Sequence, residues 1–186
     1  MKRQALLVID LQNDYYPSGK WPLHKIEQAT ENTQQLLSQF RSSNQPVIHV
    51  YHEFESDDAP FFTIGSQGAE IHHQVKPIAG EDVVRKTTVN AFLNTNLQQI
   101  LQQKNIEELV IVGAMSHMCI DAAVRAASDF GFSCIVPQDA CASRDLEING
   151  QVVAAEQVHN AYMAALGFAY AEVTDTEQLL HKLKAA

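Results

Sequence analysis

Two nearly continuous apolar runs constrain the fold of this chain more than any other feature. One covers residues 5–9 (Ala-Leu-Leu-Val-Ile), and the other covers residues 109–113 (Leu-Val-Ile-Val-Gly). Strands that are buried on both faces are apolar throughout, whereas half-exposed strands alternate with polar residues. Because similar runs recur between segments with helical spacing, the pattern predicts an α/β fold with a mostly parallel sheet covered by helices.

The other segments complete a three-layer α/β/α architecture with a six-stranded sheet. Apolar runs predict strands over residues 5–10, 46–51, 82–86, 109–113, 133–137 and 168–173. Helical spacing predicts helices over residues 25–42, 94–104, 118–130, 151–166 and 175–184, with Gly131 and Gly167 as helix ends and Thr174 or Asp175 as a cap. Residues 54–80 lack a clear period and predict a long functional loop with one short turn. Since no repeat or linker is visible, we expect one domain over residues 1–186.

Charge and composition exclude several classes of function. The chain has 13 Lys+Arg against 22 Asp+Glu, and a net charge of −9 repels a phosphate backbone, so nucleic acid is not an expected partner. No stretch approaches the roughly 18–20 apolar residues of a membrane span, and the first apolar run is too short for a signal peptide. The three cysteines are odd in number and lack CxxC spacing, which favours free thiols. We therefore expect a cytoplasmic protein with no membrane partner.

Two predicted strands are followed by reactive side chains. Asp10 ends the first strand, and the turn after residue 113 brings Cys119 to the start of a helix. Ligands of open parallel sheets bind beyond the carboxyl ends of the strands, so both positions are candidates. An aspartate at a strand end is often only the first polar loop residue, and a free cysteine is usually a small core residue. We favour that structural interpretation for Cys134 and Cys141.

Cys119 differs from the other cysteines in its expected position. The N–H groups at a helix N-terminus carry partial positive charge, which predicts a thiol pKa below the usual value of about 8.5. The same N–H groups can bind a developing oxyanion, so a nucleophile and its oxyanion hole can share one turn. Lys86 also ends an apolar strand, but most lysines are solvated, and its position alone is weak evidence.

Six segments, taken in order along the chain, resemble the isochorismatase-like hydrolases. This family includes nicotinamidases and N-carbamoyl amidases. The resemblance covers almost the whole chain. It rests on residues 7–15 (LVIDLQNDY), 84–86 (VRK), 90–92 (NAF), 113–120 (GAMSHMCI), 125–131 (RAASDFG) and 139–142 (DACA). It implies a cysteine hydrolase that cleaves a C–N bond of a small molecule without a cofactor.

The resemblance also implies a role for individual residues. Asp10 is expected to act as base and acid, Lys86 as the charge partner, and Cys119 as the nucleophile that forms a thioester. A cis peptide bond is expected between Ala114 and Met115. The N–H groups of Met115 and Cys119 are expected to form the oxyanion hole.

Further expectations concern the substrate pocket and the assembly. The resemblance favours Tyr15 and Phe92 among the aromatic residues as substrate contacts. It implies a homo-oligomer, either a dimer or a tetramer. The loop over residues 54–80 is then expected to cover the site or to meet a second subunit.

The chain departs from two branches of the family. Nicotinamidases carry an Asp-x-His and a further His that bind a metal, and residues 49–54 (HVYHEF) lack that spacing. We therefore expect neither a metal nor nicotinamidase activity. True isochorismatases cleave a vinyl ether without a cysteine nucleophile, so Cys119 favours C–N hydrolysis. An adventitious ion could still bind His52, Glu53, His72 or His73.

Three alternatives stay open. The chain could hydrolyse a vinyl ether, or it could be a catalytically silent relative that only binds a ligand. Cys119 could also be a redox-active thiol, which would require Cys134 or Cys141 as its resolving partner.

Overall fold

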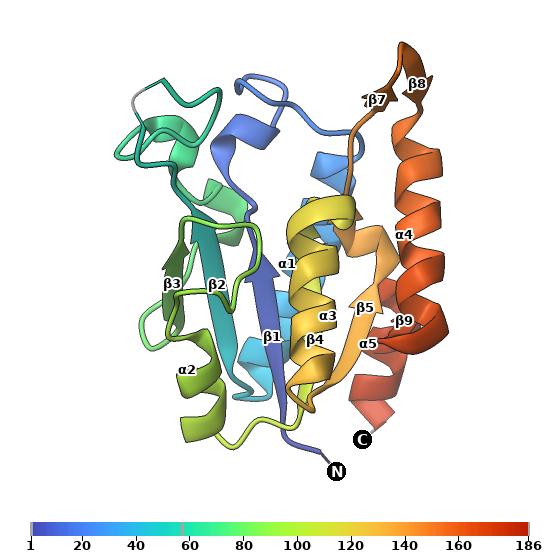
Figure 1. Ribbon diagram of the computed structural model, residues 1–186. Coiled ribbons are helices and arrows are strands. Elements are labelled where there is room, and N and C mark those ends of the chain that lie inside the picture. Colours follow the sequence, from blue (N-terminus) through green and yellow to red (C-terminus); the bar gives the residue numbers. More distant parts are fainter. Residues whose placement is uncertain (1, 57, 186) are drawn as a thin grey trace.

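A computed structural model describes residues 2–56 and 58–185 and contains one large parallel sheet (Figure 1). The strand order is β3-β2-β1-β4-β5-β9, and the short strand β6 also pairs with β4. Every pair in this sheet is parallel. The strands are β1 (Gln4–Ile9), β2 (Val47–His52), β3 (Asp82–Lys86), β4 (Glu108–Ala114), β5 (Ser133–Pro137), β6 (Cys141–Ala142) and β9 (Glu172–Thr174). The predicted six-stranded parallel sheet is confirmed, with β6 as an addition.

Helices cover both faces of the sheet and complete three layers (Figure 1). The helices are α1 (Ile26–Ser42), α2 (Leu97–Gln103), α3 (Asp121–Asp129), α4 (Ala155–Ala169) and α5 (Thr176–Ala185). Leu6 and Val8 of β1 belong to the core with α1 and α5, whereas Leu7 and Ile9 belong to the core with α2, α3 and α4. This burial on two sides explains why the strands are apolar throughout.

The nucleophile turn lies between β4 and α3. The helix predicted over residues 118–130 begins instead with a π-helical turn, Ser116–Ile120, and continues as α3. Gly131 has a φ of 90° and its N–H donates to the carbonyl oxygen of Ser128 at 2.9 Å, so the predicted helix end is confirmed.

The segment after β6 differs from the prediction. Residues 151–153 were expected in a helix, but they form β8, which pairs antiparallel with β7 (Leu146–Ile148). Asn149 and Gly150 connect these strands with φ values of 53° and 77°. An Asn-Gly pair with two positive φ values is the favoured two-residue hairpin turn, and it prevails here over the helical spacing.

The end of α4 was also predicted wrongly. The helix does not stop at Gly167 but continues to Ala169, and β9 begins at Glu172 rather than at residue 168. Gly167 is exposed, so a helix interior tolerates it there at a cost of about 1 kcal/mol relative to alanine.

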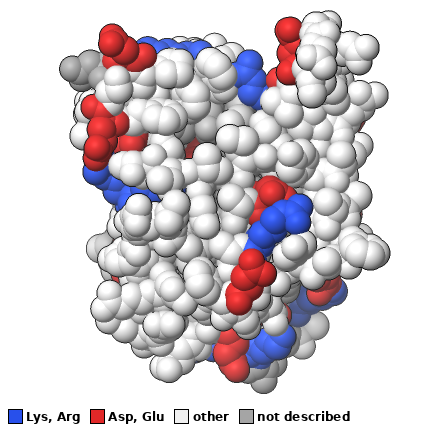
Figure 2. All heavy atoms as spheres, in the orientation of Figure 1, with Lys and Arg blue, Asp and Glu red and all other residues white. Residues whose placement is uncertain are grey.

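The described part of the long loop, residues 54–56 and 58–80, contains two short 3₁₀ turns, Gln67–Ala69 and His73–Val75, where one turn was predicted. Among the described residues, no helix is both long and apolar enough to cross a membrane. On the face shown in Figure 2, lysine and arginine are scattered among aspartate and glutamate and form no continuous basic surface.

Candidate active site

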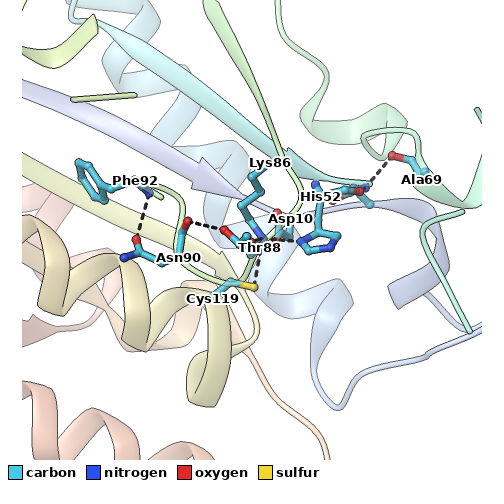
Figure 3. Close-up of polar contacts among 9 residues, drawn as sticks. Asp10, His52, Ala69, Lys86, Thr88, Asn90, Phe92 and Cys119 are labelled. Atoms are coloured by element: carbon cyan, nitrogen blue, oxygen red, sulfur yellow. Dashed lines mark hydrogen bonds and ion pairs between the residues drawn. The ribbon is translucent and has the colours of Figure 1, made fainter. Parts of the chain in front are cut away.

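Three side chains from separate strand ends meet at the carboxyl edge of the sheet (Figure 3). Asp10 follows β1, Lys86 is the last residue of β3, and Cys119 lies in the turn after β4. The Nζ atom of Lys86 lies 2.8 Å from Oδ2 of Asp10 and 3.3 Å from Sγ of Cys119. The structure therefore brings together the three residues predicted to be catalytic.

The backbone around these side chains is unusually constrained. Asp10 has a φ of 54°, and its N–H donates to the carbonyl oxygen of Val50 at 2.9 Å. Gly113 has a φ of 127°, and a Cβ atom there would lie 1.9 Å from the carbonyl oxygen of Ile9. Only glycine therefore allows β4 to approach β1 this closely. The expected cis peptide bond between Ala114 and Met115 is present.

All three reactive side chains are buried. The exposed fractions are 0% for Asp10, 1% for Lys86 and 5% for Cys119. Burial alone would lower the pKa of Lys86, but the negative charge of Asp10, joined by that of Cys119 whenever it is a thiolate, raises this pKa overall. The lysine is therefore an ammonium ion that can balance a negative charge on either neighbour.

The prediction of a low thiol pKa is wrong for the free protein. Burial, followed by the charge of Asp10, raises the pKa of Cys119 well above its usual value, and the opposing effect of Lys86 is smaller. Cys119 lies in the π-helical turn before α3, where burial is the largest influence on its pKa. The resting Cys119 is a protonated thiol, so it needs a base before it can attack a carbonyl carbon.

The model of the isochorismatase domain matches residues 4–178 of this chain. The chain belongs to the isochorismatase family. The family protein YddQ of Bacillus subtilis is 49% identical to it over 176 residues, which cover 95% of this chain and 98% of that protein.

Solved structures and named enzymes of the family are also similar to the chain. The crystal structure of an isochorismatase-family protein from Oleispira antarctica has a TM-score of 0.94 and 51% identity, and the match covers 97% of each chain. The N-carbamoylsarcosine amidase of Arthrobacter is 27% identical over 159 residues, which cover 76% of this chain and 60% of that enzyme. The chain is thus an isochorismatase-family hydrolase.

A fourth side chain, that of His52, contacts the ammonium group of Lys86. Nδ1 of His52 lies 2.9 Å from Nζ of Lys86, and the carbonyl oxygen of Thr88 lies 3.1 Å from the same nitrogen. His52 is 5% exposed, and burial together with Lys86 lowers its pKa to about 4. The sequence predicted His52 only as a ligand for an adventitious ion. The available signal was that His52 directly follows the strand predicted over residues 46–51, because other site residues also lie at strand ends.

The two predicted substrate contacts occupy different surroundings. Tyr15 is 1% exposed, and burial together with the charges of Asp10 and Cys119 raises its pKa well above the usual value. Its ring lies 4.5 Å from that of Phe62. Phe92 packs against Phe130, with ring centroids 5.4 Å apart, and in Figure 3 its ring points away from Cys119. Tyr15 is therefore close enough to Asp10 and Cys119 for their charges to affect it.

Buried polar side chains that follow β1 hold the loop over residues 54–80 in place. Nε2 of Gln12 donates to the carbonyl oxygens of His52 and Ala69, each at 2.7 Å. Oδ2 of Asp14 accepts from the N–H of Phe62 at 2.7 Å. The ring of Phe61 lies 5.7 Å from that of Tyr15 and stacks on Trp21 at 4.8 Å. Together with Phe62, these rings form an aromatic wall around Tyr15.

The remaining candidate ligands and thiols have other polar or aromatic neighbours. The ring of His72 stacks on Tyr16, with ring centroids 3.7 Å apart. Within residues 2–56 and 58–185, no group of three or more His, Cys, Asp or Glu side chains is arranged to hold a metal. All three cysteines are buried and free. Sγ of Cys134 contacts the carbonyl oxygen of Val124 and Sγ of Cys141 contacts that of Pro137, so neither has another sulfur as its polar neighbour.

Proposed function

We propose that this hydrolase cleaves a C–N bond of a small amide-type substrate through a thioester on Cys119. The observation that carries the proposal is the buried contact of Lys86 with both Asp10 and Cys119, at 2.8 and 3.3 Å. A protein that only binds a ligand has no need for a carboxylate, an ammonium and a thiol in mutual contact in its interior.

In the first half of the reaction, Asp10 takes the proton of the Cys119 thiol. The thiolate attacks the carbonyl carbon, and a C–S bond forms while the carbonyl oxygen becomes an oxyanion. We assign the N–H groups of Met115 and Cys119 to that oxyanion. The C–N bond then breaks, and the leaving nitrogen receives the proton held by Asp10.

In the second half, water hydrolyses the thioester. Asp10 takes a proton from the attacking water, and the new C–O bond replaces the C–S bond. The released thiolate recovers a proton, which restores the starting state. Lys86 keeps its positive charge throughout and balances whichever of its two neighbours is negative.

Two considerations favour an amide-type substrate. The N-carbamoylsarcosine amidase among the relatives is an amidase by name, and it matches 76% of this chain. A carboxylate beside the thiol can also return its proton to a leaving amine, which is a poor leaving group until it is protonated. The aromatic wall around Tyr15 would fit an apolar part of a small molecule.

The assembly and the location of the protein stay proposals. Ile148 and Val152 of the β7–β8 hairpin are each 65% exposed, and Phe168 of α4 is 91% exposed. Apolar side chains this exposed support the predicted homo-oligomer, a dimer or tetramer, which light scattering would measure. The cytoplasmic location likewise remains a prediction.

The test is a substrate panel of primary amides, N-carbamoyl compounds and isochorismate, with ammonia or pyruvate release as the readout. We expect turnover of at least one C–N substrate, and a mass increase equal to the acyl group on the peptide that contains Cys119 after acid quenching. Turnover of the vinyl ether alone would replace the proposal with isochorismatase chemistry. No turnover, together with tight binding of a panel member, would favour the silent ligand-binding relative.

A further inference from the structure

His52 contacts the lysine that links Asp10 to Cys119, yet the proposed mechanism gives it no role. It is the last residue of β2, and its register partner in β3 is Lys86 itself. Paired residues of neighbouring strands point to the same side of a sheet, so the two side chains lie next to each other. The contact between Nδ1 and Nζ, 2.9 Å long, is therefore built into the sheet register.

The chemistry of the contact determines which nitrogen of His52 carries the proton. An ammonium group has three hydrogens and accepts none, so Nδ1 must be the acceptor and the hydrogen of the neutral ring sits on Nε2. Burial and the charge of Lys86 both favour this neutral ring, which agrees with its low pKa. His52 thus provides a fixed, uncharged acceptor for one hydrogen of Lys86.

The surroundings of the ring argue against a purely structural histidine. The ring lies against Phe54, with centroids 4.3 Å apart, and Nε2 has no hydrogen-bond partner within residues 2–56 and 58–185. A buried donor without a partner is costly, and His49 has the same cost at Nδ1, so what distinguishes His52 is that its bonded nitrogen contacts Lys86. An apolar side chain would pack among these aromatic rings without that cost, so packing alone does not explain why a histidine is here.

The polar neighbours of the Lys86 ammonium show what His52 adds to the site. Within the described residues, Nζ has hydrogen-bond contacts to His52 at 2.9 Å, to the carbonyl oxygen of Thr88 at 3.1 Å and to Cys119 at 3.3 Å, and it lies 2.8 Å from Oδ2 of Asp10 as an ion pair. Of the three side chains in this set, Asp10 and Cys119 change charge as the proton moves between carboxylate and thiol, whereas the ring of His52, like the Thr88 carbonyl, stays uncharged. It can therefore hold the ammonium in place in both charge states.

We infer that His52 is a positioning residue, whose Nδ1 holds the ammonium of Lys86 at the site that stabilises the Cys119 thiolate. The inference rests on the proposed function, because it gives the thiolate a catalytic role. Its test does not, because it reads the thiol directly.

The test compares substitutions that differ only in where they place an acceptor. His52→Asn keeps an acceptor oxygen near the place of Nδ1, His52→Leu removes it, and His52→Gln moves it toward the place of Nε2. His49→Leu is the matched control, because His49 is a buried histidine of the same strand whose Nε2 contacts Glu81 at 2.9 Å. Circular dichroism first establishes that each variant is folded.

The readout is the rate of Cys119 alkylation by iodoacetamide at pH 8, measured by peptide mapping. We expect His52→Leu and His52→Gln to react roughly tenfold more slowly than the unsubstituted protein, because a charge-assisted hydrogen bond of Lys86 is lost. His52→Asn and His49→Leu should stay within about threefold. If His52→Leu does not fold, the comparison of Asn with Gln carries the same information.

Two results would overturn the inference. One is an alkylation rate in His52→Leu, or in His52→Gln where Leu does not fold, equal to that of the unsubstituted protein. The other is a rate in His52→Asn as low as in those variants. If the substrate panel shows no amide hydrolysis but the expected order of rates is found, the proposed function fails while the positioning role stands. With an active substrate, kcat should follow the same order and KM should change little.

Discussion

Removal of the buried cation should destabilise the protein strongly. In Lys86→Met, the side chain keeps its approximate length but loses its charge, and the carboxylate of Asp10 loses the cation 2.8 Å away. Because Asp10 is fully buried, water cannot replace that partner. Breaking a buried ion pair from one side costs about 3–5 kcal/mol. For a chain of 186 residues, this corresponds to a fall in Tm of roughly 6–20 °C.

A double substitution separates the charge effect from the loss of packing. Asp10→Asn combined with Lys86→Met removes both charges and should recover at least about 1 kcal/mol of the free energy of unfolding, because no ion is left buried without a partner. Lys104→Met is the matched control. Lys104 pairs with Asp82 at 3.0 Å in a partly exposed position, where an ion pair contributes only about 0–1 kcal/mol.

Urea denaturation followed by circular dichroism measures all four proteins. The reasoning is refuted if Lys86→Met unfolds within about 1 kcal/mol of the unsubstituted protein and the double variant is no more stable than the single one. Equal losses in Lys86→Met and Lys104→Met would show that burial of the pair has no special consequence.

Three further predictions concern the base, the thiol and the backbone. Asp10→Asn should lower kcat at least a hundredfold while circular dichroism shows an unchanged fold, because the general base is lost; near-normal turnover would exclude Asp10 as the base. Because burial raises the pKa of Cys119, its alkylation rate at pH 7 should be lower than that of free cysteine. The rate should still increase above pH 9. A plateau near pH 7 would contradict a protonated resting thiol. Gly113→Ala should lower the free energy of unfolding by at least about 2 kcal/mol, because its Cβ would meet the Ile9 carbonyl oxygen at 1.9 Å. Gly80→Ala, at a positive φ but with open space around it, should cost only about 1 kcal/mol, and equal losses at the two positions would exclude the steric explanation.

Most of the architecture could be predicted because burial on two faces leaves a direct trace in the sequence. Residues 5–9 and 109–113 are apolar throughout, and they form the two neighbouring central strands β1 and β4. Once these strands are parallel, their carboxyl ends must meet, and Asp10 and Cys119 come together as a consequence.

What could not be predicted depends on pairing and burial rather than on composition. The contact of His52 with Lys86 follows from the register between β2 and β3, which the sequence of either strand does not specify. The raised pKa of Cys119 follows from the depth of its burial and from the charge of Asp10. The hairpin at Asn149 and Gly150 was missed for a different reason. Its turn residues favour a hairpin, but the helical spacing of the segment that follows led to a helix prediction that began too early.

The central claim is that Cys119 is the nucleophile, and the turnover of Cys119→Ala on the best substrate of the panel tests it most directly. Cys134→Ala is the matched control, because Cys134 is another buried free thiol. The account predicts that Cys119→Ala loses turnover by a factor on the order of a thousand or more while Cys134→Ala keeps it within a few fold. Turnover by Cys119→Ala close to that of the unsubstituted protein would contradict the covalent mechanism.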